Sequence, residues 1–196
     1  MAGRWGRREG FGAYGARGIP GWQALARELD RHVTGIASPV HSERGLAARL
    51  RYLTASAAGY AAMERAGISV TQRTLLAWLA EERTPNRRNR GRIDAAYWDL
   101  RRRNMVADFK RRLNSRGGTR IEIHPVDQRR VEAGRERDIP PRRLTIRSTY
   151  GVWDDMVDAW IAGDTQALDV IWDEIIADLG SDYDAYSYVE SVGIGM

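Results

Sequence analysis

The stretch SAAGYAAMERAGISVTQRTLLAWLAEER, residues 56–83, constrains the fold most, because it predicts two short helices joined by a turn. Gly67 suits the end of the first helix, where a positive φ is cheap only for glycine. Ile68 supplies an apolar side chain to fill the turn. Ser69 or Thr71 can then cap the second helix by accepting hydrogen bonds from its free amides. This pattern is typical of a helix-turn-helix.

The second helix of this pair has one apolar face and one face that suits DNA. Leu75, Trp78 and Leu79 recur at helical spacing and form the face that we expect to be buried. An ordinary helical hairpin in a protein core is the alternative interpretation, but a basic segment follows at once. The residues that we expect to contact double-stranded DNA are Thr71, Gln72, Arg73, Thr74, Ala77, Arg83, Arg87, Arg88 and Arg90.

Gln72 and Arg73 stand at the start of the second helix, where side chains reach base edges in the major groove. We expect these two residues to read bases, and Thr74 and the later arginines to contact phosphates. Leu76 and Ala77 occupy positions where base-reading polar side chains are frequent. Either they contact thymine methyl groups, or little sequence is read there.

Charge is divided unevenly along the chain, whose formal net charge is +5. Residues 1–150 hold all 31 Lys and Arg residues and 15 of the 26 Asp and Glu residues, whereas residues 151–196 hold 11 acidic residues and no basic one. Arginine suits phosphates and base edges through its planar fork. A GC-rich genome also supplies arginine, but it does not explain the segregation. A basic body of this kind indicates a nucleic-acid partner.

Hydrophobic periodicity predicts a mostly α protein of the α+β class. Besides the pair above, we expect helices over 21–35, around 46–53 after a cap at Ser42, and over 92–114, 151–162 and 165–179, with strands over 119–126 and 142–148. The expected segments are a flexible basic arm (1–20), a helix-turn-helix domain (21–90), a long basic helix with two short strands (91–150) and an acidic helical subdomain (151–196).

The second strand, RRLTIRS, either pairs with the first or adds to a partner's sheet. Its alternation places Arg143, Thr145 and Arg147 on one face, and Leu144 and Ile146 on the other. A hydroxyl between two guanidinium groups suits a nucleotide phosphate, because the cations offset its charge and favour the alkoxide during attack. Threonine also simply suits a strand, so both interpretations stay open.

The acidic end predicts a helical hairpin over 151–179 that packs as a separate subdomain and either pairs protomers or recruits a protein. Asp154, Asp155 and Asp158 have helical spacing but lack a clear further ligand for Mg²⁺, so we expect a solvated acidic face and no metal. The same face is expected to carry Asp169, Asp173 and Asp178.

Several classes of protein are excluded by what the sequence lacks. It has no cysteine, so it has neither disulfides nor cysteine-based zinc sites. Its three histidines are scattered, and no catalytic-triad signature, phosphate-binding loop or dinucleotide fingerprint is present. No apolar run reaches the ~18 residues of a membrane span, and the N-terminus has no apolar signal segment. We expect no enzyme activity of its own, no cofactor, no membrane partner and a cytoplasmic location on the nucleoid.

Four short stretches occur in the same order as in the actinobacterial telomere terminal proteins, which the chain resembles over residues 46–180 with gaps. They are ARLRYL (48–53), GIS and QRT around the turn, RRLT (142–145), and DAWIAGD with later AL and I (158–171). The resemblance implies a helix-turn-helix protein that becomes covalently joined to a 5′ DNA end through a hydroxyl. That hydroxyl primes end-filling by a recruited DNA polymerase, together with a telomere-associated protein.

By position, the resemblance assigns the priming hydroxyl to Thr145, flanked by Arg143 and Arg147. The neighbouring hydroxyls, which are the fallback acceptors, are Ser148, Thr149 and Tyr150. Two other functions stay open. A transcriptional regulator would bind a palindromic operator as a homodimer, and a structural nucleoid or virion-associated protein would bind DNA without priming.

Overall fold

The computed structural model describes residues 11–147 and 151–195, and the chain forms two compact units. Unit 1 is formed by residues 1–32 and 107–196, and unit 2 by residues 33–106. Unit 2 is thus inserted into the sequence of unit 1, and helix α5 (Arg87–Leu113) supplies residues to both. The described residues form seven α-helices and a four-stranded antiparallel sheet, so the predicted class, mostly α of the α+β type, is confirmed.

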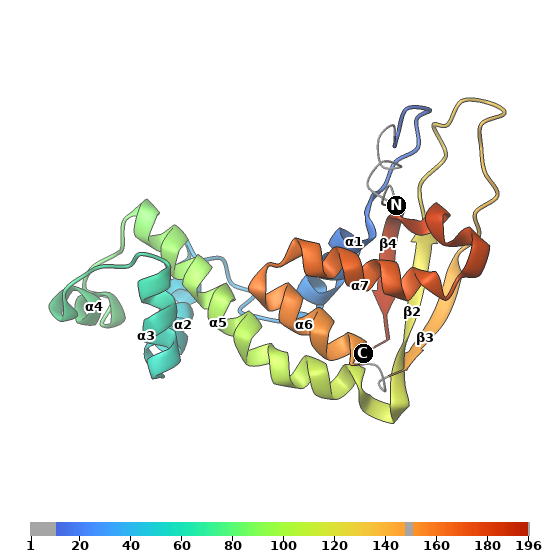
Figure 1. Ribbon diagram of the computed structural model, residues 1–196. Coiled ribbons are helices and arrows are strands. Elements are labelled where there is room, and N and C mark those ends of the chain that lie inside the picture. Colours follow the sequence, from blue (N-terminus) through green and yellow to red (C-terminus); the bar gives the residue numbers. More distant parts are fainter. Residues whose placement is uncertain (1–10, 148–150, 196) are drawn as a thin grey trace. The chain divides into compact units, whose positions relative to one another are not determined.

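Unit 2 is a helical bundle in which three short helices share one core with the first part of α5 (Figure 1). These helices are α2 (Glu43–Thr54), α3 (Ala57–Arg65) and α4 (Gln72–Leu79). Ser42 caps α2 as predicted, and Ser56 caps α3. The buried core side chains are Leu50, Leu53, Ala62, Met63, Trp78, Ile93, Ala96, Tyr97 and Leu100.

The turn between α3 and α4 closes as the sequence predicts. Gly67 has a φ of 73°, and the amide of Ile68 donates back to the last turn of α3 at 3.0 Å. The Ile68 side chain packs against the core. Thr71, and not Ser69, caps α4, because its side chain accepts from the Thr74 amide at 3.2 Å. Of the two caps that the sequence allowed, the later one is used.

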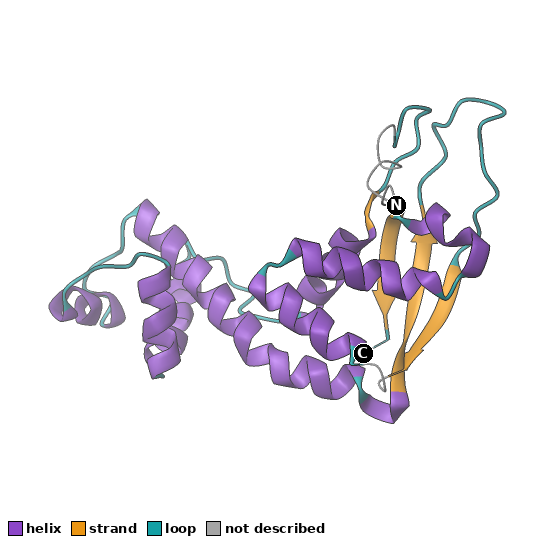
Figure 2. Ribbon diagram, in the orientation of Figure 1, coloured by secondary structure: helices purple, strands orange, loops and turns teal. Residues whose placement is uncertain are grey.

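The sheet of unit 1 has the strand order β1-β4-β2-β3, and all neighbours are antiparallel. Both predicted strands exist and pair with each other, which makes β3 an edge strand. Figure 2 shows β4, β2 and β3 side by side. The last strand in the sequence, β4, lies between β1 and β2. The bounds are β1 (Ile19–Pro20), β2 (Gly118–Pro125), β3 (Arg142–Arg147) and β4 (Tyr188–Ile194).

Helices pack against one face of this sheet. Helix α1 packs along β4 and α7, and α7 packs along α6 (Figure 1). Trp153 Nε1 donates to Ile146 O at 3.1 Å, and Trp172 Nε1 donates to Tyr186 O at 3.0 Å, so both buried indoles have partners. The bounds are α1 (Gly21–His32), α6 (Val152–Ala162), α7 (Thr165–Ala177) and the 3₁₀ helices η2 (Ser115–Gly117) and η4 (Gly180–Tyr186).

The structure divides the chain differently from the four segments expected from the sequence. Helix α1 packs on the sheet, so it leaves the expected domain over 21–90 and belongs to unit 1. The expected acidic subdomain over 151–196 is not separate, because α7 packs on α1, and β4 pairs with β1 and β2. Residues 1–10 of the expected flexible arm lie outside the described residues.

Two smaller expectations are corrected. The long helix begins at Arg87 and not at residue 92, because the Asn86 side chain accepts from the Asn89 amide at 2.9 Å and starts the helix earlier. Asp169, expected on a solvated face, is buried with 4% exposure, because its side of α7 turns toward the packed layer of unit 1.

Candidate nucleic-acid interface

Helix α4 presents one face to the core of unit 2 and the other to solvent. Trp78 is buried, and Leu75 and Leu79 pack against the same core, as the spacing predicts. The predicted division of the helix into an apolar face and an outward face is therefore confirmed. The outward side chains are Gln72, Arg73 and Leu76, which are exposed, and Ala77, which is half-buried.

The two threonines expected at DNA, Thr71 and Thr74, stabilise the start of α4. Thr71 Oγ1 accepts from the Thr74 amide at 3.2 Å, and the two hydroxyl oxygens lie 3.0 Å apart. These bonds stabilise the first turn of the helix. The turn that carries Gln72 and Arg73 is therefore stabilised by side chains of the same turn.

Five arginines expected at DNA share one property: within the part of the chain that the structure describes, their side chains make no hydrogen bond or ion pair. They lie on α4, in the segment after it and in the first turn of α5. Because a guanidinium offers five donors and keeps its charge, each of them is open to an external anion. The five are Arg73, Arg83, Arg87, Arg88 and Arg90.

The start of α5 concentrates positive charge. Its first turn carries Arg87, Arg88 and Arg90 and no acidic residue. Positive side chains at this end face the partial positive charge of the free helix amides, which costs stability. Amides and arginines together attract phosphate. The arrangement is therefore unfavourable in the isolated protein and favourable when an anion is bound.

Other arginines of unit 2 have partners within the unit. Arg65 and Arg103 both donate to Asp99, at 2.6 and 3.0 Å. Burial raises the pKa of Asp99, but the hydrogen bonds and charges of these arginines outweigh it, so the pKa lies below its ordinary value of 3.8. Arg101 Nε donates to Thr34 O at 2.6 Å. These arginines therefore stabilise unit 2 through intramolecular contacts, unlike the five arginines described above.

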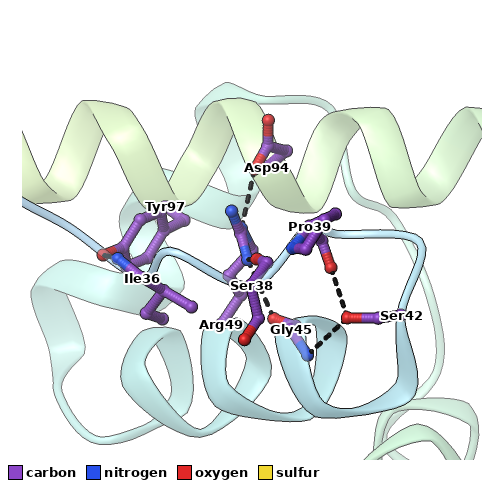
Figure 3. A network of polar contacts seen from close by, with 8 residues as sticks. All are labelled: Ile36, Ser38, Pro39, Ser42, Gly45, Arg49, Asp94 and Tyr97. Atoms are coloured by element: carbon purple, nitrogen blue, oxygen red, sulfur yellow. Dashed lines mark hydrogen bonds and ion pairs between the residues drawn. The ribbon is translucent and has the colours of Figure 1, made fainter.

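A buried arginine joins α2 to α5 (Figure 3). Arg49 is 4% exposed, and its guanidinium donates to Asp94 Oδ1 and to Ser38 O, both at 2.7 Å. It lies 5.1 Å from the centre of the Tyr97 ring, whose hydroxyl accepts from the Ile36 amide at 2.7 Å. This network fixes α2 against the helix whose first turn carries the unpaired arginines.

Formal charge differs between the two units. Unit 2 holds 13 arginines and 6 acidic residues, a formal charge of +7, whereas unit 1 holds 18 basic and 20 acidic residues, a formal charge of −2. The basic body that the sequence indicated up to residue 150 is therefore concentrated in residues 33–106.

Thr145 lies on β3, at the edge of the sheet. Thr145, Arg143 and Arg147 are exposed and Ile146 is buried, so the predicted alternation is confirmed. The direct cross-strand partner of Thr145 is Arg120 of β2. Residues directly opposite each other bring their Cβ atoms to about 4.5–5.5 Å. The hydroxyl therefore has arginines on both sides along its strand and a third across from it.

One of these three arginines is already paired. Arg143 Nη2 lies 3.0 Å from Glu122 Oε1, on its cross-strand partner. The side chains of Arg120 and Arg147 make no ion pair with any other described residue, so they supply the free positive charge around Thr145. Sequence reasoning missed Arg120, because its place depends on the pairing register of two strands. The fallback hydroxyls Ser148, Thr149 and Tyr150 lie outside the described residues.

A cavity of about 560 Å³ lies beside β3. Two of its carboxylates, Glu174 and Asp178, make no ion pair with another described residue, and they disfavour a phosphate there. The carboxylates of the cavity are therefore less suited to an anion than the solvent face that Thr145 shares with Arg120. The cavity is lined by Thr145, Ile146, Arg147, Val152, Glu174, Ile175 and Asp178.

The acidic helices are engaged in internal contacts. Lys110 lies 2.7 Å from Asp158, and Asn114 Nδ2 donates to Asp154 Oδ1 at 2.7 Å. Among residues 11–147 and 151–195, no three His, Asp or Glu side chains gather into a possible metal site. In the same ranges, no helix combines the length and the apolar character of a membrane crossing.

Comparisons of the chain with protein-family models, curated proteins and solved structures found no match.

Proposed function

We propose that the protein binds double-stranded DNA sequence-specifically, through a helix-turn-helix formed by α3 and α4. The observation that carries this proposal is a set of arginines that begins on α4 and ends in the first turn of α5, and whose side chains have no partner among the described residues. Unit 2 also has a formal charge of +7, which favours the approach of a phosphate backbone.

In this proposal α4 enters the major groove. Gln72 and Arg73 contact base edges, because they lie exposed on the first turn of the helix. Arg83 and the arginines at the start of α5 contact phosphates. Base contacts distinguish one sequence from another, whereas phosphate contacts act on all sequences and weaken with salt. The two sets of residues are therefore separable by experiment.

The test compares Arg73→Ala with Arg87→Ala, on a duplex selected from a randomised library and on an unrelated duplex. Arg73→Ala should lose ~1–3 kcal/mol of binding free energy on the selected duplex only. Arg87→Ala should weaken binding to both duplexes and lower the slope of log K against log salt by about 1. Arg103→Ala is the control, because this arginine of α5 already pairs with Asp99. Equal losses on both duplexes for Arg73→Ala would remove its base-reading role.

We further propose that Thr145 accepts the first nucleotide at a 5′ DNA end, as the resemblance to telomere terminal proteins implies. The exposure of Thr145 and the free guanidinium groups of Arg120 and Arg147 support this role. Thr145 Oγ1 attacks the α-phosphorus of a deoxynucleoside triphosphate, the bond to pyrophosphate breaks, and the hydroxyl proton passes to water. A partner DNA polymerase, joined by a telomere-associated protein, supplies the metal ions for in-line transfer.

Covalent labelling tests this second proposal. With the polymerase and telomeric DNA present, radiolabel from the nucleotide should stay on the protein after boiling in detergent. Thr145→Val keeps the shape of the side chain but lacks the oxygen, so it should abolish the label and leave duplex binding unchanged. Thr145→Ser should retain part of the label. If label survives in Thr145→Val and maps to residues 148–150, the acceptor hydroxyl is one of those three residues and not Thr145.

Transcriptional regulation is the alternative function, and a structural role on the nucleoid or in a virion ranks below it. A regulator would use the same α4 as a homodimer on a palindromic site, without any covalent nucleotide. Sedimentation of the chain with its selected duplex would give two copies on one palindrome. A structural protein would enrich no particular sequence. The priming and regulatory functions both place the protein in the cytoplasm, on the nucleoid.

A further inference from the structure

Leu76 is the most exposed large apolar side chain of the described residues, with 56% of its surface accessible. It lies on the outward face of α4, one helical turn after Gln72 and Arg73. Leaving a leucine in water forfeits the free energy of its burial. No described residue of unit 2 covers it, so its side chain is available for an external apolar contact.

The surroundings of Leu76 are shallow and polar. Ala77 and Ala80 lie beside it and are small, so a flat surface can approach the helix closely. Arg73 brings a free positive charge at one end, and Glu82 brings a negative charge at the other. The residues that line this hollow are Gln72, Arg73, Leu76, Ala77, Ala80 and Glu82.

A single apolar side chain among charged groups fits DNA better than a second protein surface. A protein interface is built around a cluster of buried apolar side chains, and the neighbours of Leu76 in the hollow are alanine or polar. The major groove, in contrast, shows an isolated apolar group, the 5-methyl of thymine, between hydrogen-bonding groups. The unpaired arginines match the phosphates on either side.

We infer that Leu76 contacts the 5-methyl group of a thymine, so that the DNA target holds a thymine close to the base that Arg73 reads. This inference rests on the proposed DNA binding. Residues three apart on a helix have Cβ atoms about 5–6 Å apart, and base pairs stack every ~3.4 Å. The thymine therefore lies one or two base pairs from the Arg73 contact, which for arginine is most often a guanine.

The experiment uses the full chain and the duplex selected from a randomised library. Each thymine of that duplex is replaced in turn by uracil, which removes the methyl group and keeps every hydrogen-bonding group. One replacement should weaken binding about fourfold, the effect of burying one methyl group. Leu76→Ala should weaken binding to the thymine duplex at least as much. It should also no longer distinguish thymine from uracil at that position, because the two changes remove the same contact.

Val170→Ala is the matched control, because Val170 is also an apolar helix residue with 53% exposure, on α7 of unit 1. It should change neither the affinity nor the preference for thymine. Thermal unfolding of Leu76→Ala should match that of the wild type, because an exposed leucine adds little to stability. If the unfolding midpoint of Leu76→Ala does change, Leu76→Met is measured in its place. This variant keeps a large apolar side chain and should keep the preference for thymine.

The outcomes separate the inference from the proposed function. If no duplex is enriched, the proposed function fails. If a duplex is enriched but uracil is tolerated at every thymine, the inference is overturned while DNA binding stands. The inference is also overturned if Leu76→Ala keeps the difference between thymine and uracil. Leu76 would instead be a contact between protein chains if Leu76→Ala changed the sedimentation of the DNA-free protein but kept the difference in affinity between thymine and uracil.

Discussion

Arg120 of β2 lies directly opposite Thr145 of β3. Its guanidinium makes no ion pair with another described residue, whereas Arg143, two residues from Thr145 on the same strand, pairs with Glu122 at 3.0 Å. A phosphate bound at the threonine hydroxyl therefore has a free cation across the strand pair. Of these two arginines, the cross-strand one is expected to hold the phosphate.

The first prediction follows from this difference. Arg120→Gln should slow nucleotide attachment to Thr145 roughly 10- to 100-fold, because one charge-assisted hydrogen bond contributes about 1.5–3 kcal/mol. Arg143→Gln should have a smaller effect, since its charge is already offset by Glu122. The initial rate of radiolabel incorporation measures both. A larger loss in Arg143→Gln would show that the Glu122 pair opens to bind the phosphate.

The second prediction concerns the buried pair of unit 2. Asp94→Ala leaves the guanidinium of Arg49 buried with only carbonyl partners, and it should lower the free energy of unfolding by about 3 kcal/mol. Arg49→Met should cost less, because Asp94, with a 35% exposed side chain, can bind water instead. Denaturant titration measures both losses. Arg51→Met, which removes a 69% exposed arginine from the same helix, is the control and should change stability by less than ~1 kcal/mol.

The third prediction concerns pH. The pKa of Asp99 is lower in the folded protein than its ordinary value of 3.8, so its ionised form favours the folded state. This contribution is complete above pH values near 3.8 and disappears as the pH falls through the lower folded pKa. Asp99→Asn should therefore be less stable than the wild type at pH 7, and the two should converge below pH 3.8. A gap that persists unchanged as the pH falls well below 3.8 would show that the charge of Asp99 does not matter.

The fourth prediction concerns Glu81, which follows α4 and has a φ of 61°. A side chain in this left-handed region costs free energy that glycine avoids, although glycine is also freer in the unfolded chain. Glu81→Gly should raise the free energy of unfolding by about 0.5–1 kcal/mol. Glu81→Ala removes the same carboxylate but keeps Cβ, so it should give no gain. Equal stabilisation by both changes would trace the effect to charge and not to the backbone.

Local chemistry in the sequence was enough to predict the helix pair of unit 2. A glycine with a positive φ, an apolar turn residue and a hydroxyl cap act on neighbouring residues, so Gly67 and Ile68 could be assigned directly, and the cap was limited to Ser69 or Thr71. The strand around Thr145 was also predicted, because alternation over six residues is a local signal, whereas its place at the edge of the sheet was not. The contacts of these side chains with DNA stay predictions.

Long-range pairing could not be predicted in the same way. Strand β4 has glycine at position 193 and two consecutive exposed residues, Glu190 and Ser191, so its pattern does not alternate. Its place between β1 and β2 depends on residues more than 60 positions away in the sequence. For the same reason Arg120 was missed: no local pattern fixes which residue of β2 lies across from Thr145.

The central position of β4 sets the order in which the protein can fold during synthesis. Residues 33–106 leave the ribosome with every helix of their own core, so unit 2 can fold while translation continues. Helix α1 is made earlier still, but its buried residues Leu25 and Leu29 belong to a unit whose middle strand is synthesised after all its other strands. The apolar face of α1 therefore has its full set of packing partners only after Tyr188–Ile194 has been synthesised.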